Sequence, residues 1–281
     1  MMIKSPNTSW TNINSSPILN AEFRTHSNYL NYISGLSVGL KIIPSIKTTT
    51  RLSVIPVLVK KKISLTLLTF NNIDLEMNQL NKFRDYAQIC SSWIPVKSYY
   101  LFFNLVLILE WLIDDDIKWL TQTHEAVNRR LKDLIRNKEI NFSEPYFNTI
   151  IPAVSVSSWK IPSGSNMVIG NPDPKTRYRQ IIKKILDYKK DDFKRRRNIK
   201  RLVSINNTNF LTSTNINLWE FLYWYRIKAN YRDMEFLESG VDISDFYIYY
   251  LNYHTLCCNL HEAFINEINR ISTLKYGVAL M

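Results

Sequence analysis

Glycine is scarce in this chain, with six residues among 281. Proteins built from many tight β-turns usually need more, because glycine adopts positive φ at no steric cost. The scarcity therefore argues against an all-β fold. Neither G-x-x-x-x-G-K-[ST] nor G-x-G-x-x-G occurs, so a conventional P-loop ATPase or Rossmann enzyme is not expected.

Cysteine is also rare: Cys90, Cys257 and Cys258 are the only three. They are too few for a disulfide framework or a Cys-rich zinc site and are typical of a reducing compartment. The first 30 residues are polar and contain no apolar segment of the signal-peptide kind. We therefore expect a cytoplasmic protein.

Long apolar runs are missing as well. The longest, residues 99–113, has about 15 residues and includes Asn104 and Glu110. A membrane-spanning helix needs about 20 apolar residues. We expect a buried helix here and no membrane partner.

Positive charge is abundant and concentrated. The formal net charge is +12, and residues 175–201 contain thirteen Lys or Arg against three acids. The aromatic residues Tyr178, Tyr188 and Phe193 lie between them, so the segment could neutralise phosphates and stack on unpaired bases. We predict a patch that contacts RNA, formed by Lys194, Arg195, Arg196, Arg197, Lys200 and Arg201. The alternative is a solvated helix face followed by a basic loop.

Apolar periodicity predicts a mainly α-helical fold. Helical patterns begin at about Asn72, with Asp74 as a candidate N-cap, and continue to about residue 140; Pro95 is expected in a first helical turn. Helices are also predicted near 176–197, from Leu218 and at 244–271. Residues 52–70 suggest a strand or two, and 142–175 suggest a loop-rich insertion with a short strand at 153–159. Residues 204–217 are expected to be a polar connector.

Three motifs follow one another in a recognisable order. They are "VKSYYLFFNLVLILEWLI", "TQTHEAVNRRLKDL" and "YRIKANYRD". The first resembles the paired-tyrosine helix of HEPN domains, and the second resembles the Thr-His helix start that follows it. The third is similar to the family's Arg-x-Lys-Ala-Asp-Tyr-x-Asp signature, with Asn230 in place of the first Asp.

The resemblance implies an antiparallel bundle of four to five helices, commonly dimeric. Residues 72–141 and 216–281 would form it, with 1–71 as an N-terminal accessory segment and 142–215 as a basic insertion. Some such domains are RNases of toxin–antitoxin or defence systems. Others accompany a minimal nucleotidyltransferase and bind a nucleotide, a nucleic acid or that enzyme.

The resemblance also implies a site on the bundle. Its candidate catalytic residues are Arg226, Tyr231, Asp233 and His124, and its candidate nucleotide- or nucleic-acid-binding residues are Lys228, Tyr99 and Tyr100. The family's Arg-x4–6-His motif is absent. Because a metal-independent RNase needs a base for the 2′-OH proton, Tyr231 or His124 would have to supply it.

Structural roles remain open for the same side chains. Arg226 could form a buried salt bridge with Glu110 or Asp233. One of Tyr99 and Tyr100 is expected in the core, with the other hydrogen-bonding toward Arg226. His124 would then be an ordinary neutral histidine at a capped helix start.

Two groups look like metal ligands. The aspartates 114–116 are consecutive and point in different directions on a helix, so they suit a helix boundary better. His254, Cys258 and His261 share a helix face but have no fourth ligand. We expect no metal and no cofactor.

Two functions therefore stand as hypotheses. The first is a HEPN-like protein of a prokaryotic defence or toxin–antitoxin type that binds RNA or a nucleotide and cleaves RNA with a non-standard catalytic set. The second is a non-catalytic module that pairs with a minimal nucleotidyltransferase or with a second copy of itself. The missing motif favours the second, and the basic segment favours the first.

Overall fold

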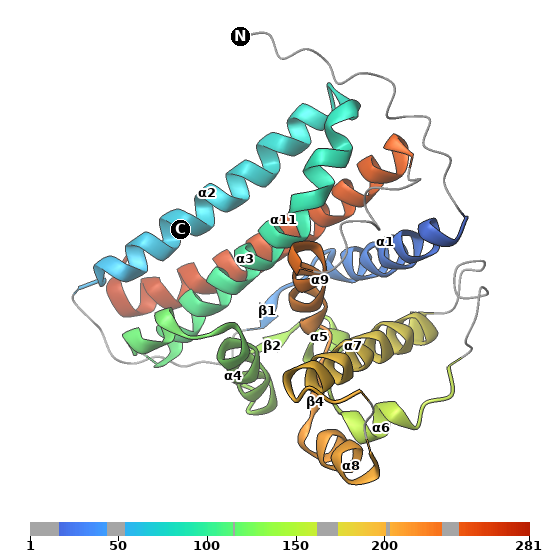
Figure 1. The fold of residues 1–281 in the computed structure, drawn as a ribbon. Helices are drawn as coiled ribbons and strands as arrows, with labels where there is room; N and C mark the ends of the chain where they lie inside the picture. The colour runs from blue at the N-terminus through green and yellow to red at the C-terminus, as the bar shows by residue number, and fades with distance from the viewer. Residues whose placement is uncertain (1–16, 44–53, 115, 162–173, 201–202, 232–241) are drawn as a thin grey trace.

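The computed structural model describes residues 17–43, 54–114, 116–161, 174–200, 203–231 and 242–281. The fold is mainly helical, which confirms the predicted class (Figure 1). Its longer helices are α1 (Pro17–Ser37), α2 (Val57–Leu80), α3 (Ala87–Asp114), α4 (His124–Arg136), α7 (Pro174–Arg196), α8 (Ser204–Ser213), α9 (Glu220–Tyr231) and α11 (Ile243–Tyr276). Shorter turns of helix are η2 (Arg84–Tyr86), η3 (Ile117–Thr121), α5 (Pro145–Asn148) and α6 (Ala153–Ser157).

Helix α3 is the centre of the protein. Every residue from Leu101 to Leu112 is buried, as expected for a helix that is apolar on all sides. Helices α2, α9 and α11 pack against it, and α1 packs against α11 (Figure 1). Helices α1 and α2 therefore contribute to the same core, although most of both lies in the predicted accessory segment 1–71.

The apolar run at 99–113 belongs to a longer helix than the sequence suggested. By length and composition alone, Arg84–Asp114 could cross a membrane, but 78% of its most apolar window is buried inside the protein. The core helix of a water-soluble protein has the same features, so this is weak evidence for a membrane span.

The strands predicted within 52–70 are wrong, because α2 occupies Val57–Leu80 without a break. Its buried residues include Val59, Ile63, Thr66 and Ile73, and their spacing of three to four places, with one longer step, follows the helical period. The Asp74 N-cap is also wrong, since this residue lies inside the helix.

Helix α3 also begins earlier than predicted. It starts at Ala87, so Pro95 lies inside it and not in its first turn. Because proline has no N–H, the carbonyl of Ser91 loses its partner four residues on. The hydroxyl of the same residue, Ser91, donates to the carbonyl of Phe246 in α11, at 3.0 Å, and this bond connects the two helices.

Two small antiparallel strand pairs connect distant parts of the chain. In one, β1 (Ile42–Ile43) pairs with β2 (Asn141–Phe142), with Ile42 opposite Phe142. In the other, β3 (Ile150–Pro152) pairs with β4 (Asn215–Asn217), with Ile151 opposite Ile216. The strand predicted at 153–159 is wrong, since Ala153–Ser157 is helix α6, and the predicted connector 204–217 contains α8 and β4.

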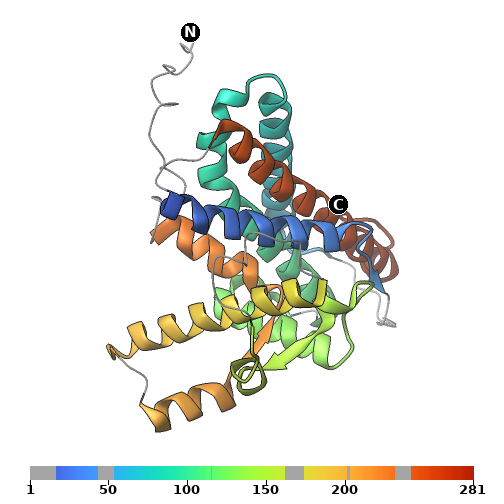
Figure 2. The ribbon, with the colours of Figure 1, turned by 90° about the vertical axis from the view of Figure 1, so that its right-hand side faces the viewer.

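The basic segment forms the amphipathic helix α7. Its apolar face buries Tyr178, Ile181, Ile182, Ile185 and Leu186. Helix α7 packs against α6 and α9, and in Figure 2 it crosses the molecule with α8 below it. Because the apolar face of α7 packs against these helices, the basic side chains on its other face have a fixed position next to α9.

Candidate functional site

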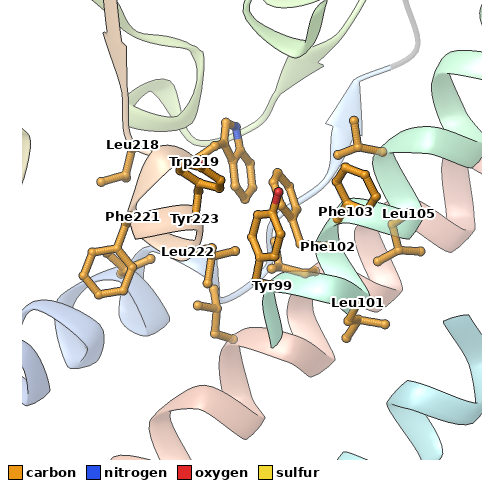
Figure 3. Packing of buried hydrophobic residues seen from close by; sticks show 14 of the residues in the cluster. Tyr99, Leu101, Phe102, Phe103, Leu105, Leu218, Trp219, Phe221, Leu222 and Tyr223 are labelled. Atoms are coloured by element: carbon orange, nitrogen blue, oxygen red, sulfur yellow. The ribbon is translucent and has the colours of Figure 1, made fainter. Parts of the chain in front are cut away.

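A cluster of polar and aromatic side chains forms where α3, α4 and α9 meet. Helix α9 supplies Arg226, helix α3 supplies Tyr99 and Tyr100, and His124 is the first residue of α4. Figure 3 shows Tyr99 of α3 facing Tyr223 of α9, with 5.7 Å between the ring centroids. We call these five residues the Arg226 cluster.

The position of His124 is set by a helix cap. The Thr123 side chain accepts a hydrogen bond from the Ala126 amide, at 3.3 Å. This is the usual N-cap arrangement, and it fixes the first turn of α4. The imidazole therefore projects from a defined helix end.

Hydrogen bonds connect His124 to both neighbouring helices. Its Nδ1 lies 2.9 Å from the Tyr99 hydroxyl, and its Nε2 lies 3.5 Å from Nη1 of Arg226. A guanidinium can only donate, so Nε2 must carry the lone pair and Nδ1 the proton. The Tyr99 hydroxyl then accepts the Nδ1–H bond.

The charge state of His124 agrees with this assignment. Burial, and then the positive charges of Arg226 and Lys62, lower the pKa of His124 to about 4. At neutral pH the imidazole is therefore uncharged, with a basic nitrogen beside a guanidinium. This is the arrangement of a general base next to an anion-binding group.

Arg226 lies among aromatic rings. Its Cζ is 4.8 Å from the Tyr99 ring centroid, 5.7 Å from that of Tyr100 and 5.4 Å from that of Tyr223. Among the described residues no carboxylate forms an ion pair with Arg226, and these cation–π contacts stabilise its guanidinium. Nη1 also donates to the Tyr100 hydroxyl, at 3.3 Å.

The two adjacent tyrosines have different surroundings. Tyr99 is 1% exposed and Tyr100 is 37% exposed. The open side of the cluster is therefore at Tyr100, whereas Tyr99 belongs to the core and positions the imidazole.

Glu110 is not the partner of Arg226. This carboxyl group is fully buried, and neither of its oxygens has a hydrogen-bond partner. Burial raises the pKa of Glu110 to about 8. The alternative of an Arg226–Glu110 salt bridge is therefore wrong.

The other residues of the HEPN-like signature lie elsewhere or outside the described ranges. Lys228 is buried on α9. Burial, and then the positive charge of Lys228, lower the pKa of His26. Lys228 therefore faces away from the Arg226 cluster. Tyr231 ends α9, but its side chain, like the whole of Asp233, is outside the described residues.

The predicted RNA patch at the end of α7 is partly neutralised. Lys194 pairs with Asp191 at 2.6 Å, and Arg195 with Asp192 at 2.5 Å. Arg196 joins Asp192 and, across to α4, Glu125. Arg197 lies over the Phe193 ring at 4.5 Å. Lys200 is exposed, whereas Arg201 is outside the described residues.

A cavity of about 560 Å³ opens next to the Arg226 cluster, between α4, α7, α8 and α9. Glu220, the first residue of α9, is 4% exposed on its wall. It accepts hydrogen bonds from Lys132 at 2.5 Å and Lys189 at 2.9 Å. Burial disfavours its ionised form, but the two lysines outweigh this effect and lower the pKa of Glu220.

Sequence reasoning missed this cavity and its ion triad. The available signal was an acid inside the otherwise apolar "LWEFLYWY", since a carboxylate there must find buried cations. Tyr223 was missed too, and it both lines the cavity and contacts Arg226.

Four of the residues considered as metal ligands have other partners, Cys258 lies 3.6 Å from His254, and Asp115 is outside the described residues. His254 Nε2 lies 3.1 Å from Asp74, and His261 stacks on Phe70 with 3.7 Å between centroids. Asp114 pairs with Arg130 at 2.7 Å, and Asp116 caps η3. Within the described part of the chain, no three His, Cys, Asp or Glu side chains gather as metal ligands.

No protein-family model, curated protein or solved structure matches this chain. The function of this protein is therefore inferred from the geometry of the Arg226 cluster.

Proposed function

We propose that this protein is a HEPN-like RNA-binding protein whose Arg226 cluster cleaves phosphodiester bonds without a metal ion. One observation carries the proposal: Nη1 of Arg226 lies 3.5 Å from Nε2 of a neutral His124. The sequence has no Arg-x4–6-His motif, but the fold supplies an arginine and a histidine from two different helices.

The roles follow from the donor and acceptor atoms. Arg226 would bind the non-bridging phosphate oxygens, because a guanidinium offers parallel N–H donors to such a group. As the N–H donors of Arg226 turn from Nε2 of His124 to the phosphate, the lone pair of Nε2 becomes free and would take the 2′-OH proton as O2′ attacks phosphorus. The exposed hydroxyl of Tyr100, bonded to Arg226, would protonate the leaving 5′ oxygen. The products are a 2′,3′-cyclic phosphate and a 5′-OH.

Substrate binding would make His124 a better base. Its pKa of about 4 partly reflects the positive charge of Arg226. A bound phosphate places negative charge beside both groups and so raises the pKa of the imidazole toward neutrality. The bound substrate would therefore increase the basicity of His124.

The RNA strand would reach the site along the end of α7. The side chains of Arg195 and Arg196 are 59% and 51% exposed despite their ion pairs, and Lys200 is exposed beyond them. Such contacts to phosphates are largely independent of sequence. They weaken as the salt concentration rises, because the counterions that binding releases from the RNA then gain less entropy. We expect salt-sensitive binding of single-stranded RNA.

The test is cleavage of a 5′-labelled single-stranded RNA in the presence of EDTA. Variants are Arg226→Gln and His124→Gln, with His261→Gln as the matched control. Burial lowers the pKa of His261 to about 4 as well, but this ring stacks on Phe70, away from Arg226. We expect each site variant to reduce the rate by about 10²–10⁴-fold and the control to cleave normally.

The ends of the RNA products identify the attacking group. Mass spectrometry should find 2′,3′-cyclic phosphate ends, which only attack by O2′ produces. Linear products that need a metal, or equal activity in all variants, would rule out the proposed pair.

The second candidate is a non-catalytic module that self-associates or binds a nucleotidyltransferase. It is favoured by a row of exposed apolar side chains on one face of α2: Val57, Leu65, Leu68 and Leu75 are 69%, 49%, 66% and 60% exposed. Light scattering on the wild type and on Leu65→Glu/Leu68→Glu tests this: a dimer that becomes a monomer supports it, whereas a wild-type monomer rejects self-association.

A further inference from the structure

The outward side of α2 carries a stripe of large aliphatic side chains. The helix packs against α3 and α11 and lies at the outer edge of the bundle in Figure 1. Val57, Leu65, Leu68 and Leu75 are each 49–69% exposed. At about 100° per residue their directions fall within about 80° of one another, and along the helix axis they extend over about 27 Å. We call these four side chains and the other exposed residues of 57–82 the α2 face.

Charge on the α2 face is of one sign. Its lysines are Lys60 and Lys61, near the start of the helix, and Lys82, just after the C-cap Asn81. Apart from these and the four aliphatic residues, the exposed residues of this fully described stretch are Ser, Asn and Gln, with no acid among them. The face is therefore cationic and partly apolar.

The two acids of α2 bond to neighbouring helices. Asp74 lies 3.1 Å from Nε2 of His254 in α11, and Glu76 pairs with Lys97 in α3. Their carboxylates are therefore engaged with the bundle, and the lysines of the α2 face keep their positive charge unbalanced.

A second copy of the chain is a poor occupant for this face. In a two-fold symmetric contact the same surface lies on both sides, so three lysines would meet three lysines with no acid between them. Protein interfaces also concentrate their binding energy in a packed centre, whereas the aliphatic side chains here are spread along the helix among amides.

The surface of a lipid bilayer with anionic headgroups suits both properties of the face. Headgroup charge attracts lysines close to the surface. Leucine and valine side chains on the same side of a helix can enter the boundary between headgroups and acyl chains, and a line of them along one helix reaches that boundary together.

We propose that the α2 face binds the surface of a membrane rich in anionic phospholipid. The helix would lie parallel to the membrane, with its other side still packed on α3 and α11. The expectation of no membrane partner concerned a spanning segment, and a helix that lies on the surface is a different kind of contact. It leaves the apolar helix α3 buried inside the protein.

This contact goes beyond the proposed RNA cleavage and does not depend on it. Helix α7 lies on the other side of the bundle from α2 (Figure 1), so a membrane-bound molecule would keep its basic segment accessible. Neither Arg226 nor His124 belongs to the α2 face.

Co-sedimentation of the full chain with vesicles tests the proposal, at low and at high salt. One set of vesicles contains phosphatidylcholine and phosphatidylglycerol, and the other contains phosphatidylcholine alone. The test variants are Lys60→Gln/Lys61→Gln and Leu65→Ser/Leu68→Ser. All four positions are exposed, so folding should be preserved, which circular dichroism checks.

Matched controls change the same kinds of residue away from α2. Ile205→Ser removes an aliphatic side chain that is 69% exposed on α8. Lys160→Gln/Lys175→Gln removes two exposed positive charges near α6 and α7.

We expect the wild type and both controls to bind the anionic vesicles alike, more weakly at high salt, and to leave phosphatidylcholine vesicles largely unbound. The lysine variant should bind roughly fivefold more weakly for each lysine, or on the order of 25-fold in all. The leucine variant should bind about tenfold more weakly or worse, because it removes the inserted apolar area.

Three results would overturn the inference. One is that the wild type does not sediment with anionic vesicles. Another is that Lys160→Gln/Lys175→Gln weakens binding as much as Lys60→Gln/Lys61→Gln, which would assign binding to net charge. The third is a wild-type dimer that Leu65→Ser/Leu68→Ser makes monomeric without changing lipid binding, which would assign the face to a second copy.

Discussion

Arg226 and His124 are 102 positions apart in the chain, yet their side chains meet with 3.5 Å between Nη1 and Nε2. One is in the middle of a helix, and the other is at the capped start of another. Both contact Tyr99 of α3, so the central helix determines their separation. This geometry gives the site a base and an anion-binding group without sequence proximity.

The imidazole of His124 should make folding more favourable as pH rises. Its pKa is about 4 in the folded protein and about 6.5 in an unfolded chain. The unfolded state therefore binds more protons between these values, and the free energy of unfolding increases across this window. An NMR titration of the His124 ring protons should show a midpoint near 4.

The variant Arg226→Gln serves as the check on that titration. Removing the guanidinium leaves burial, the larger cause, in place, so the midpoint should rise only part of the way toward 6.5. A midpoint near 6.5 already in the wild type would contradict the described packing around His124.

Glu110 should reduce stability as pH rises. The folded protein keeps its proton up to about pH 8, whereas an unfolded chain releases it near 4.5. Stability then falls between these values, because the folded state binds more protons. Replacing Glu110 by Met, which has a similar volume, should increase the free energy of unfolding by about 1–3 kcal/mol at pH 8.

Urea denaturation at pH 5 and pH 8 measures this effect. The gain from Glu110→Met should be larger at pH 8. Glu262→Gln is the control, since Glu262 is exposed on α11 and its replacement should leave the pH dependence as it is. A Met variant that is less stable at pH 8 would show that the carboxyl has a partner.

The triad at Glu220 should be strongly coupled. Glu220→Gln leaves Lys132 and Lys189 together in a buried place without a carboxylate, which should cost about 3–5 kcal/mol. Adding Lys189→Met should restore part of the loss, because one lysine no longer repels the other. Chemical denaturation of the two single variants and the double variant gives the interaction energy; simple additivity would reject the coupling.

The N-cap at Thr123 should affect both the free energy of unfolding and the position of His124. Thr123→Ala should lower the free energy of unfolding by about 1 kcal/mol, whereas Thr123→Ser should nearly preserve it. Because His124 follows directly, Thr123→Ala should also reduce RNA cleavage more than Thr123→Ser does. Thermal denaturation and the cleavage assay, performed on the same preparations, separate the two effects.

The mainly helical class and the central position of α3 followed from the sequence, because they depend on local periodicity and on apolar composition. Helix α2 did not. Its exposed face carries leucines at positions where polar residues would have marked a helix, so the pattern resembled strands. The pairs β1–β2 and β3–β4 are two or three residues long, too short for any period to appear.

The site was predictable in part. The motifs singled out Arg226, Tyr99, Tyr100 and His124, and the fold brings these four together. Lys228, from the same motif, faces away because two positions along a helix turn a side chain about 200°. The Glu220 triad depends on how α4 and α7 approach α9, and no local pattern contains that information.

The contact between the first and last described helices bears on how the protein is made. His26 of α1 lies 3.1 Å from the Tyr253 hydroxyl of α11, and 227 positions separate them. During synthesis, α1 leaves the ribosome long before its partner exists, so its apolar face stays uncovered for most of translation. Folding therefore finishes late, and a chaperone that covers the apolar face of α1 during synthesis should raise the yield of native protein.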